Sequence, residues 1–241
     1  MHKLPSNIKA VLFDLGNTLY DKEQYLKGAF KEVAQKSEHI DPQIVLDLLY
    51  RIWKVHTSHY EFLFKDLLDI LGIYSAKLLD EMLRIYHNHK CRLRPYSGMP
   101  QLLKTLKKHF KIGVVTDGHP QMQRNKIAAL GWTKTFDVLI YTADYDKSYL
   151  KPNPFVYQLA IEKLGVKPRE TIYVGDNPYD DFIGAKEIGI FTIRVLQGEF
   201  KKIHLDQEHE ADLTIKKIVQ LKELLAASHR HNVGVKKSKS L

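Results

Sequence analysis

Four charged residues spread over most of the chain have the side chains that phosphoryl chemistry requires: Asp14, Asp117, Lys151 and Asp176. Carboxylates that are brought together repel one another unless a cation lies among them. An all-oxygen set suits Mg²⁺, which binds a few carboxylates and keeps water and substrate oxygens as its other ligands. A lysine beside such a set, with backbone N–H groups nearby, would hold an anion. Because an aspartate can also act as a covalent nucleophile, the set predicts metal-assisted chemistry on a phosphoryl group.

The three aspartates gain significance from their positions, because each follows a short apolar run. The runs lie at residues 9–13, 111–115 and 171–174, and they are typical of buried strands in a parallel sheet. In an open α/β sheet, ligands bind at the carboxyl ends of the strands. Alone, Asp14 would more often begin a turn or cap a helix. Three acids at three strand ends favour a shared site instead.

The order of the predicted elements indicates the fold. Residues 23–88 carry apolar side chains at helical spacing without strand-like alternation, which predicts a separate helical unit. From Arg94 onward helices and strands alternate, ending in a helix predicted at 215–227, and this alternation predicts a doubly wound parallel sheet. We therefore predict an α/β fold with a Rossmann-like core at 1–19 and 94–227, an inserted helical cap at 20–93, and a basic, disordered tail at 228–241.

Composition limits the functional class. The chain has 241 residues, of which 44% are hydrophobic and 27% charged, enough to bury a core. Its net charge of +9 comes partly from the tail, and no nucleic-acid recognition motif accompanies it. The single cysteine, Cys91, permits no internal disulfide. We find no signal-peptide pattern and no run near the ~20 apolar residues of a membrane helix. These features favour a cytoplasmic protein that binds neither nucleic acid nor membranes, and they leave protein partners open.

Four motifs, in this order, resemble those of the haloacid dehalogenase-like hydrolase superfamily. They are Asp14-Leu15-Gly16-Asn17-Thr18, Val115-Thr116-Asp117-Gly118, Lys151-Pro152, and Gly175-Asp176 with Asp181. Each motif alone is weak, but four in the right order, each at a predicted strand end or loop, are specific. The helical insertion between the first and second motifs resembles the C1-type cap of the family, which covers the site and selects the substrate.

The resemblance implies catalytic and phosphate-binding roles for the matching residues. Asp14 would be the nucleophile that forms an aspartyl-phosphate, and Lys151 would pair with it and with the phosphoryl oxygens. The Thr116 side chain and the Asp117 backbone would bind the transferred phosphoryl group. The implied enzyme is a phosphoric monoester hydrolase, and the implied substrate is a small phosphorylated metabolite.

The resemblance also implies a Mg²⁺ site. Asp14 and Asp176 would bind the ion together with the backbone carbonyl of Gly16. Asp181 would lie further out and reach the ion through water. Asp180 stands one residue away from the common spacing and is the weaker candidate.

Gly16 departs from the pattern of the family's phosphatases. These enzymes usually carry a second aspartate two residues after the nucleophile, which protonates the leaving oxygen and then activates water. General acid–base catalysis is worth ~10²–10⁴-fold, so its loss should slow the hydrolysis of alkyl phosphates more than that of acyl, aryl or anomeric phosphates. Tyr20 or Asp21 could supply the proton instead, although an ordinary role at the hinge of the cap is commoner for residues at this place.

Two alternatives remain open. A metal-free 2-haloacid dehalogenase would also lack the second aspartate, but the family's dehalogenases carry a neutral residue where this chain has Asp176. A catalytically weak member that binds a phosphorylated ligand or a protein partner is supported by Gly16 alone. Asp176 and Asp181 together favour the phosphohydrolase.

Overall fold

The computed structural model describes residues 4–37, 40–56 and 62–226, so the predicted tail at 228–241 lies outside the described residues. Over the described residues, the chain folds into two compact units. The first, here called the sheet unit, comprises Met1–Asp21, Arg94–Pro120 and Gly131–Leu241. The second, here called the helical unit, comprises Lys22–Leu93 and Gln121–Leu130.

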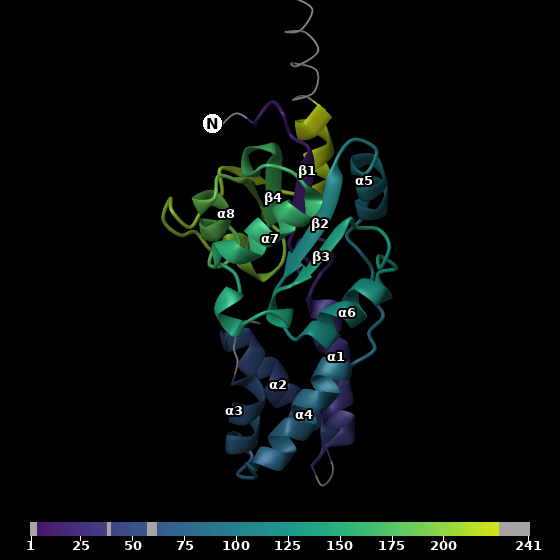
Figure 1. Cartoon of the computed structure of the whole chain (residues 1–241). Coiled ribbons are helices and arrows are strands. Elements are labelled where there is room, and N and C mark those ends of the chain that lie inside the picture. Colours follow the sequence, from purple (N-terminus) through teal and green to yellow (C-terminus); the bar gives the residue numbers. More distant parts are fainter. Residues whose placement is uncertain (1–3, 38–39, 57–61, 227–241) are drawn as a thin grey trace, which may run out of the picture. The chain divides into compact units, whose positions relative to one another are not determined.

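A six-stranded sheet forms the centre of the sheet unit (Figure 1). Its strands are β1 (Ala10–Phe13), β2 (Lys111–Thr116), β3 (Val138–Tyr141), β4 (Thr171–Gly175), β5 (Phe191–Val195) and β6 (Leu213–Ile215). They lie in the order β3-β2-β1-β4-β5-β6, and every pairing is parallel. Phe13, the last residue of β1, pairs with Val114 on one side and Val174 on the other. The residues that follow β1, β2 and β4 therefore meet at one edge of the sheet.

Helices cover both faces of this sheet, with α7 and α8 against one of them (Figure 1). The sheet unit contains the helices α5 (Met99–Leu106), α7 (Pro154–Leu164) and α8 (Ile183–Glu187). Asn153 caps the N-terminus of α7, because its side chain accepts a hydrogen bond from the Phe155 N–H at 2.9 Å. Its apolar side packs in one buried cluster with Leu12 and Tyr173 of the sheet. These features confirm the predicted α/β fold with a doubly wound parallel sheet.

The helical unit is built from α1 (Glu23–Lys36), α2 (Pro42–His56), α3 (Leu63–Ile70) and α4 (Ala76–Asn88). Buried side chains from all four helices, such as Phe30, Val45, Leu67 and Met82, form its core. The unit also includes most of α6 (Pro120–Ala129), which the sequence had placed in the core domain. The physical reason lies in contacts that the periodicity of α6 does not reveal, among them Lys126 Nζ at 4.4 Å from the centroid of the Tyr25 ring.

The C-terminal part of the sheet unit differs from the prediction. The helix predicted at 215–227 begins only at residue 221, after β6 and a 3₁₀ turn at Ile218–Gln220. β6 was not predicted, because three residues are too few for alternation to distinguish a strand from a helix. Its parallel pairing with β5 holds the segment extended.

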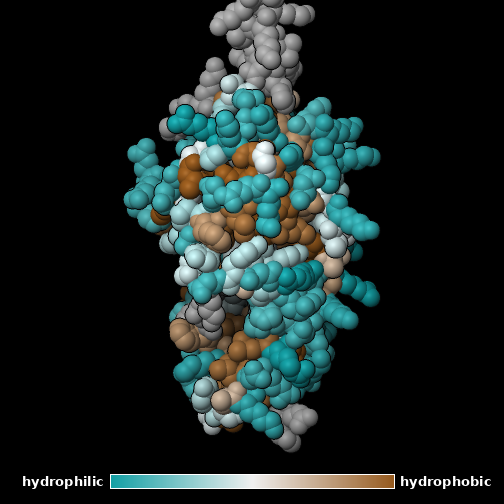
Figure 2. All heavy atoms as spheres, in the orientation of Figure 1, coloured by the Kyte–Doolittle hydropathy of each residue, from teal (hydrophilic) through white to brown (hydrophobic). Residues whose placement is uncertain are grey.

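Within the described residues, no helix combines the length and the hydropathy that crossing a membrane requires. The face drawn in Figure 2 is mostly hydrophilic, with apolar residues visible in smaller patches.

Candidate active site

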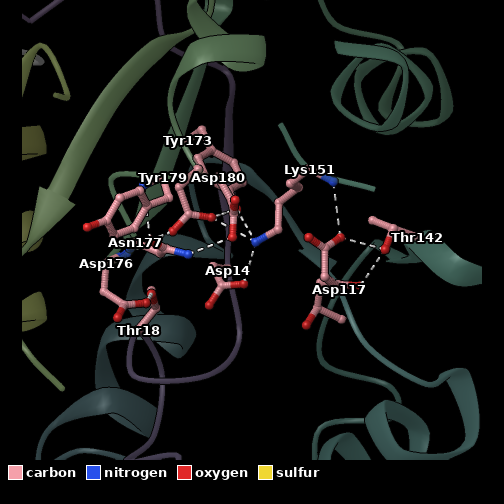
Figure 3. A network of polar contacts seen from close by, with 12 residues as sticks. Asp14, Thr18, Asp117, Thr142, Lys151, Tyr173, Asp176, Asn177, Tyr179 and Asp180 are labelled. Carbon is pink, nitrogen blue, oxygen red and sulfur yellow. Dashed lines mark hydrogen bonds and ion pairs between the residues drawn. The ribbon is translucent and has the colours of Figure 1, made fainter. Parts of the chain in front are cut away.

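The carboxyl end of β1 places Asp14 in a buried ionic cluster (Figure 3). The Asp14 N–H donates to the Val174 carbonyl at 2.9 Å, which continues the pairing of β1 with β4 one residue past Phe13. The Asp14 side chain meets Lys151, whose Nζ lies 2.7 Å from Asp14 Oδ1. The same ammonium lies 2.7 Å from Asp181 Oδ1. Three of the predicted site residues are therefore in direct contact.

The loop that carries Lys151 is held at two points. The Lys151 backbone N–H donates to Asp117 Oδ1 at 3.3 Å. The carbonyl of the next residue, Pro152, approaches α8 so closely that a Cβ on Gly184 would overlap it. A glycine at the start of α8 thus lets the loop come close enough for the Lys151 side chain to be buried.

The end of β2 supplies Thr116 and Asp117. β2 lies beside β1, so Thr116, its last residue, is buried at the same edge of the sheet as Asp14. The Asp117 carboxylate accepts a hydrogen bond at 2.6 Å from the hydroxyl of Thr142, which directly follows β3. Because it also accepts from the Lys151 N–H, Asp117 connects the ends of β2 and β3 to the Lys151 loop.

Beyond β4, a tight turn folds Asp181 back onto the strand end. Asp181 Oδ2 accepts hydrogen bonds from the backbone N–H groups of Asp176, at 3.1 Å, and Asn177, at 2.9 Å. Asp181 Oδ1 accepts from the Tyr173 hydroxyl at 2.9 Å and from the Lys151 ammonium. Both oxygens of this carboxylate are therefore engaged by the protein itself.

A glycine in the turn and a hydrogen bond from Thr18 position Asp176. A Cβ on the preceding Gly175 would overlap the Asp181 carboxylate, so the turn requires a glycine there. Asp176 Oδ1 accepts a hydrogen bond at 3.3 Å from the buried hydroxyl of Thr18. Thr18 belongs to the turn that follows β1, in which Asn17 adopts the left-handed conformation with φ of 56°. The ends of β1 and β4 are thus linked through side chains.

The acidic residues of the cluster fit a divalent cation. One carboxylate oxygen from each of Asp14, Asp176 and Asp181 lies within 4.8 Å of the others, and all three residues are buried. Oxygen donors of this charge suit Mg²⁺. Because the oxygens of Asp181 already accept hydrogen bonds, its position is more suited to an outer role than those of Asp14 and Asp176. Gly16 lies two residues after Asp14 and forms a β-bridge with Tyr20.

Burial and neighbouring charges shift the protonation equilibria of the cluster. Burial raises the pKa of Asp14 to about 6, while the Lys151 ammonium opposes this rise and the Asp181 carboxylate adds to it. Burial alone would lower the pKa of Lys151, but Asp14 and Asp181 outweigh it and raise that pKa above its ordinary value. At neutral pH the cluster therefore contains an ionised nucleophile candidate beside a charged lysine.

The weaker candidates lie at the margin of the cluster. Asp180 Oδ2 accepts a hydrogen bond from the Asn177 side chain at 2.7 Å, and burial raises the pKa of Asp180 to about 6. Tyr20 is buried and forms an isolated β-bridge with Pro95. Asp21 is the last residue of the first segment of the sheet unit.

Sequence reasoning missed Tyr173 and Thr142, although both hydroxyls contact predicted site residues. Tyr173 lies inside the apolar run of β4, where a tyrosine is indistinguishable from a packing residue. Thr142 follows β3, a strand whose end carries no acid. The only signal was position, since both stand in or just after strands of the parallel sheet.

Comparison with known proteins agrees with this geometry. A model of the family "haloacid dehalogenase-like hydrolase" matches residues 11–195. The chain is 32% identical over 228 residues to glyceraldehyde 3-phosphate phosphatase from Methanocaldococcus jannaschii, covering 90% of this chain and 97% of that protein. It is similar to the solved structure of a HAD phosphatase from Thermococcus onnurineus, with a TM-score of 0.62, 23% identity and coverage of 90% of this chain and 98% of the other. It is also similar to the solved structure of a 2-haloacid dehalogenase from Pseudomonas syringae pv. Tomato, with a TM-score of 0.64, 23% identity and coverage of 91% of this chain and 99% of the other. At these identities, the two structures show the fold alone.

Proposed function

The chain belongs to the haloacid dehalogenase-like hydrolase family, and on that premise we propose that it is a Mg²⁺-dependent phosphohydrolase acting on a small phosphorylated metabolite. The relative from Methanocaldococcus jannaschii, named as a phosphatase of glyceraldehyde 3-phosphate, supports this class of substrate. The helical unit would act as the cap that selects the substrate.

The observation that carries the proposal is the excess of carboxylates over cations in the cluster. Lys151 contacts Asp14 and Asp181 directly, and Asp176 lies within reach of the same point. Burying several carboxylates around one ammonium is costly unless a further cation compensates them. Bound by Asp14, Asp176 and the carbonyl of Gly16, with Asp181 further out, Mg²⁺ would supply the neutralisation of negative charge that phosphoryl transfer requires.

The residues of the chain would perform the reaction in two steps. The Asp14 carboxylate attacks phosphorus, the bond from phosphorus to the leaving oxygen breaks, and an aspartyl-phosphate forms. Lys151 holds Asp14 in place and binds a phosphoryl oxygen, together with the Thr116 hydroxyl and the Asp117 N–H. A water molecule then attacks phosphorus, which releases inorganic phosphate and restores the carboxylate of Asp14.

Gly16 shapes the range of substrates in this proposal. No side chain at this position can protonate the leaving oxygen, so a leaving group that is stable as an anion is favoured. Aryl and acyl phosphates should therefore turn over faster than simple alkyl phosphates, by a part of the ~10²–10⁴-fold that general acid catalysis usually contributes.

The test is a screen of phosphorylated metabolites, with p-nitrophenyl phosphate and acetyl phosphate as activated substrates. Wild type and Asp14→Asn are assayed in parallel for phosphate release, with Mg²⁺ and with EDTA. We expect release that requires Mg²⁺ and is lost in the variant. If even the activated substrates yield no phosphate, the catalytically weak, ligand-binding alternative replaces the proposal.

Adding 2-haloacids to the same screen tests whether the protein is a dehalogenase. Halide release from 2-haloacids in EDTA, without phosphate release from any ester, would overturn the phosphohydrolase. The buried Asp176 argues against that result, since a metal-free reaction at Asp14 leaves its charge uncompensated.

A further inference from the structure

We infer that Tyr173 is a positioning residue whose hydroxyl completes a set of three acceptors that fixes the ammonium of Lys151 beside Asp14. The inference rests on the proposed phosphohydrolase function and deepens it, because it assigns to a buried residue of β4 the orientation of the proposed phosphate-binding lysine. Tyr173 is labelled beside the carboxylates in Figure 3.

The acceptors around the Lys151 ammonium limit its motion. A lysine ammonium has three N–H donors and no acceptor. Lys151 Nζ lies 2.7 Å from Asp14 Oδ1, 2.7 Å from Asp181 Oδ1 and 3.3 Å from the Tyr173 hydroxyl oxygen. With two acceptors, the ammonium could still swing about the line that joins the two carboxylates. The Tyr173 hydroxyl limits this swing. Because it lies 2.9 Å from Asp181 Oδ1, both oxygens lie on the same side of the ammonium, and an N–H remains for a phosphoryl oxygen.

Tyr173 is much more rigid than the lysine it contacts. Tyr173 lies in the middle of β4, beside Leu12 of β1, and is fully buried. Its ring meets the ring of Tyr157 edge to face, with centroids 4.9 Å apart and planes at 87°. A lysine, by contrast, has a flexible four-carbon chain. The sheet thus fixes the hydroxyl, and the hydroxyl fixes the end of the lysine.

The Tyr173 hydroxyl acts on both members of the Lys151–Asp181 pair. It donates to Asp181 Oδ1 at 2.9 Å while it accepts from the Lys151 ammonium. The bond to Lys151 is the longest of the three that the ammonium makes. Because the Tyr173 hydroxyl and Asp181 Oδ1 lie on one side of the ammonium, the contact with Tyr173 is kept when a phosphoryl oxygen binds another N–H of Lys151. Asp181 stays in place, because the hydroxyl still donates to it.

The matched pair of variants is Tyr173→Phe and Tyr157→Phe. Each removes one buried hydroxyl from the same aromatic pair, but the Tyr157 hydroxyl bonds only backbone carbonyls, those of Asp180 at 3.1 Å and Asp181 at 3.0 Å. With p-nitrophenyl phosphate and Mg²⁺, Tyr173→Phe should lower kcat about tenfold and change KM less than about twofold, as expected for one lost hydrogen bond to a charged group that orients Lys151. Tyr157→Phe should lower the Tm about as much as Tyr173→Phe does, because each variant loses one buried hydroxyl. It should leave kcat within about threefold of the wild-type value. Equal losses of kcat in the two variants would overturn the inference.

A variant cycle tests whether Tyr173 acts through Lys151. Lys151→Arg keeps the charge but replaces three tetrahedral donors by a planar fork, which cannot use the same three acceptors. In that background, Tyr173→Phe should cost less than about twofold in kcat, because the interaction is already lost. A tenfold loss in both backgrounds would show that Tyr173 acts independently of the lysine.

An NMR measurement tests the inference without an assay of enzyme activity. The ¹⁵N-labelled ammonium of Lys151, identified by the loss of its NMR signal in Lys151→Arg, should exchange its hydrogens with water at least about tenfold faster in Tyr173→Phe than in wild type or Tyr157→Phe. Unchanged exchange would overturn the role of Tyr173 even if the phosphohydrolase is confirmed. Faster exchange in a protein that releases no phosphate would support the positioning while the proposed function fails.

Discussion

Two buried cations of the sheet unit, Lys151 and Arg194, have contrasting surroundings. Arg194 is fully buried in β5, and its Nη1 lies 2.6 and 2.7 Å from the two carboxylate oxygens of Glu210. Its Nη2 donates to the carbonyls of Phe200 and Ile203 at 2.7 and 2.8 Å. One carboxylate therefore matches one guanidinium in charge, and two carbonyls accept from Nη2, while Nε is buried without a hydrogen-bond partner among the described residues. The result is a charge-balanced arrangement that fixes the loop after β5.

The balance around Lys151 is the opposite. Three buried carboxylates, those of Asp14, Asp176 and Asp181, lie close together, and one ammonium contacts two of them. A buried charge persists only where it is compensated, so a balanced pair can be purely structural, whereas an excess of one sign calls for a further ion. The difference between the two cations thus separates a structural ion pair from a site suited to chemistry, without reference to any relative.

The largest effect on activity should come from the nucleophile candidate. Asp14→Asn keeps the size of the side chain but removes the attacking charge, so phosphate release should fall by more than about 10³-fold. The measurement is phosphate release from the best substrate, with circular dichroism as the control for folding. Retention of more than a tenth of the activity would show that the excess of carboxylates serves only to bind metal and that attack comes from elsewhere.

The second prediction compares the two cations directly. Lys151→Met leaves Asp14 and Asp181 buried without their shared ammonium, and breaking a buried pair in this way costs about 3–5 kcal/mol. The free energy of unfolding from urea titration, without Mg²⁺, should fall by about this amount. Excess Mg²⁺ should then restore part of the stability of the variant, because it binds the folded state only.

Arg194→Met is the matched control for this prediction. It leaves Glu210 without its guanidinium, but the side chain of Glu210 is 24% exposed and can be hydrated. The loss of stability should therefore be smaller than in Lys151→Met, and Mg²⁺ should not reverse it. Equal rescue of both variants by Mg²⁺ would contradict the distinction between a balanced and an unbalanced cluster.

The same contrast explains what could be predicted from the sequence. Asp14 and Asp176 were accessible because acids that follow apolar runs stand out and parallel strands bring their ends together, whereas Lys151 was found through the Lys-Pro motif of the family. Arg194 and Tyr173 were not accessible, since each lies inside a strand and its partner depends on tertiary packing that no local pattern encodes. The inclusion of α6 in the helical unit was missed for the same reason.

The third prediction concerns the backbone that brings the carboxylates together. In Gly175→Ala, the new Cβ would overlap the Asp181 carboxylate, and overpacking of this kind costs about 1–3 kcal/mol. Because Asp181 is displaced, the Mg²⁺ concentration required for half-maximal activity should rise together with the loss of stability. The control is Gly189→Ala, where a Cβ would meet no atom closer than 4.0 Å but φ is 87°. Backbone strain should destabilise that variant, whereas its Mg²⁺ requirement should stay unchanged.

The smallest effect should come from adding a carboxylate where the cluster meets the substrate. Gly16 is not among the glycines with positive φ, so Gly16→Asp introduces no left-handed strain. The new acid should protonate the leaving oxygen and raise the turnover of an alkyl phosphate about tenfold, which is below the ~10²–10⁴-fold usual for general acid–base catalysis because its pKa is not tuned for the task. Turnover of p-nitrophenyl phosphate should change little, since that leaving group needs no proton. The ratio of the two rates cancels changes in folded fraction and metal occupancy. An unchanged ratio, in a variant that still binds Mg²⁺, would mean that another residue already supplies the proton.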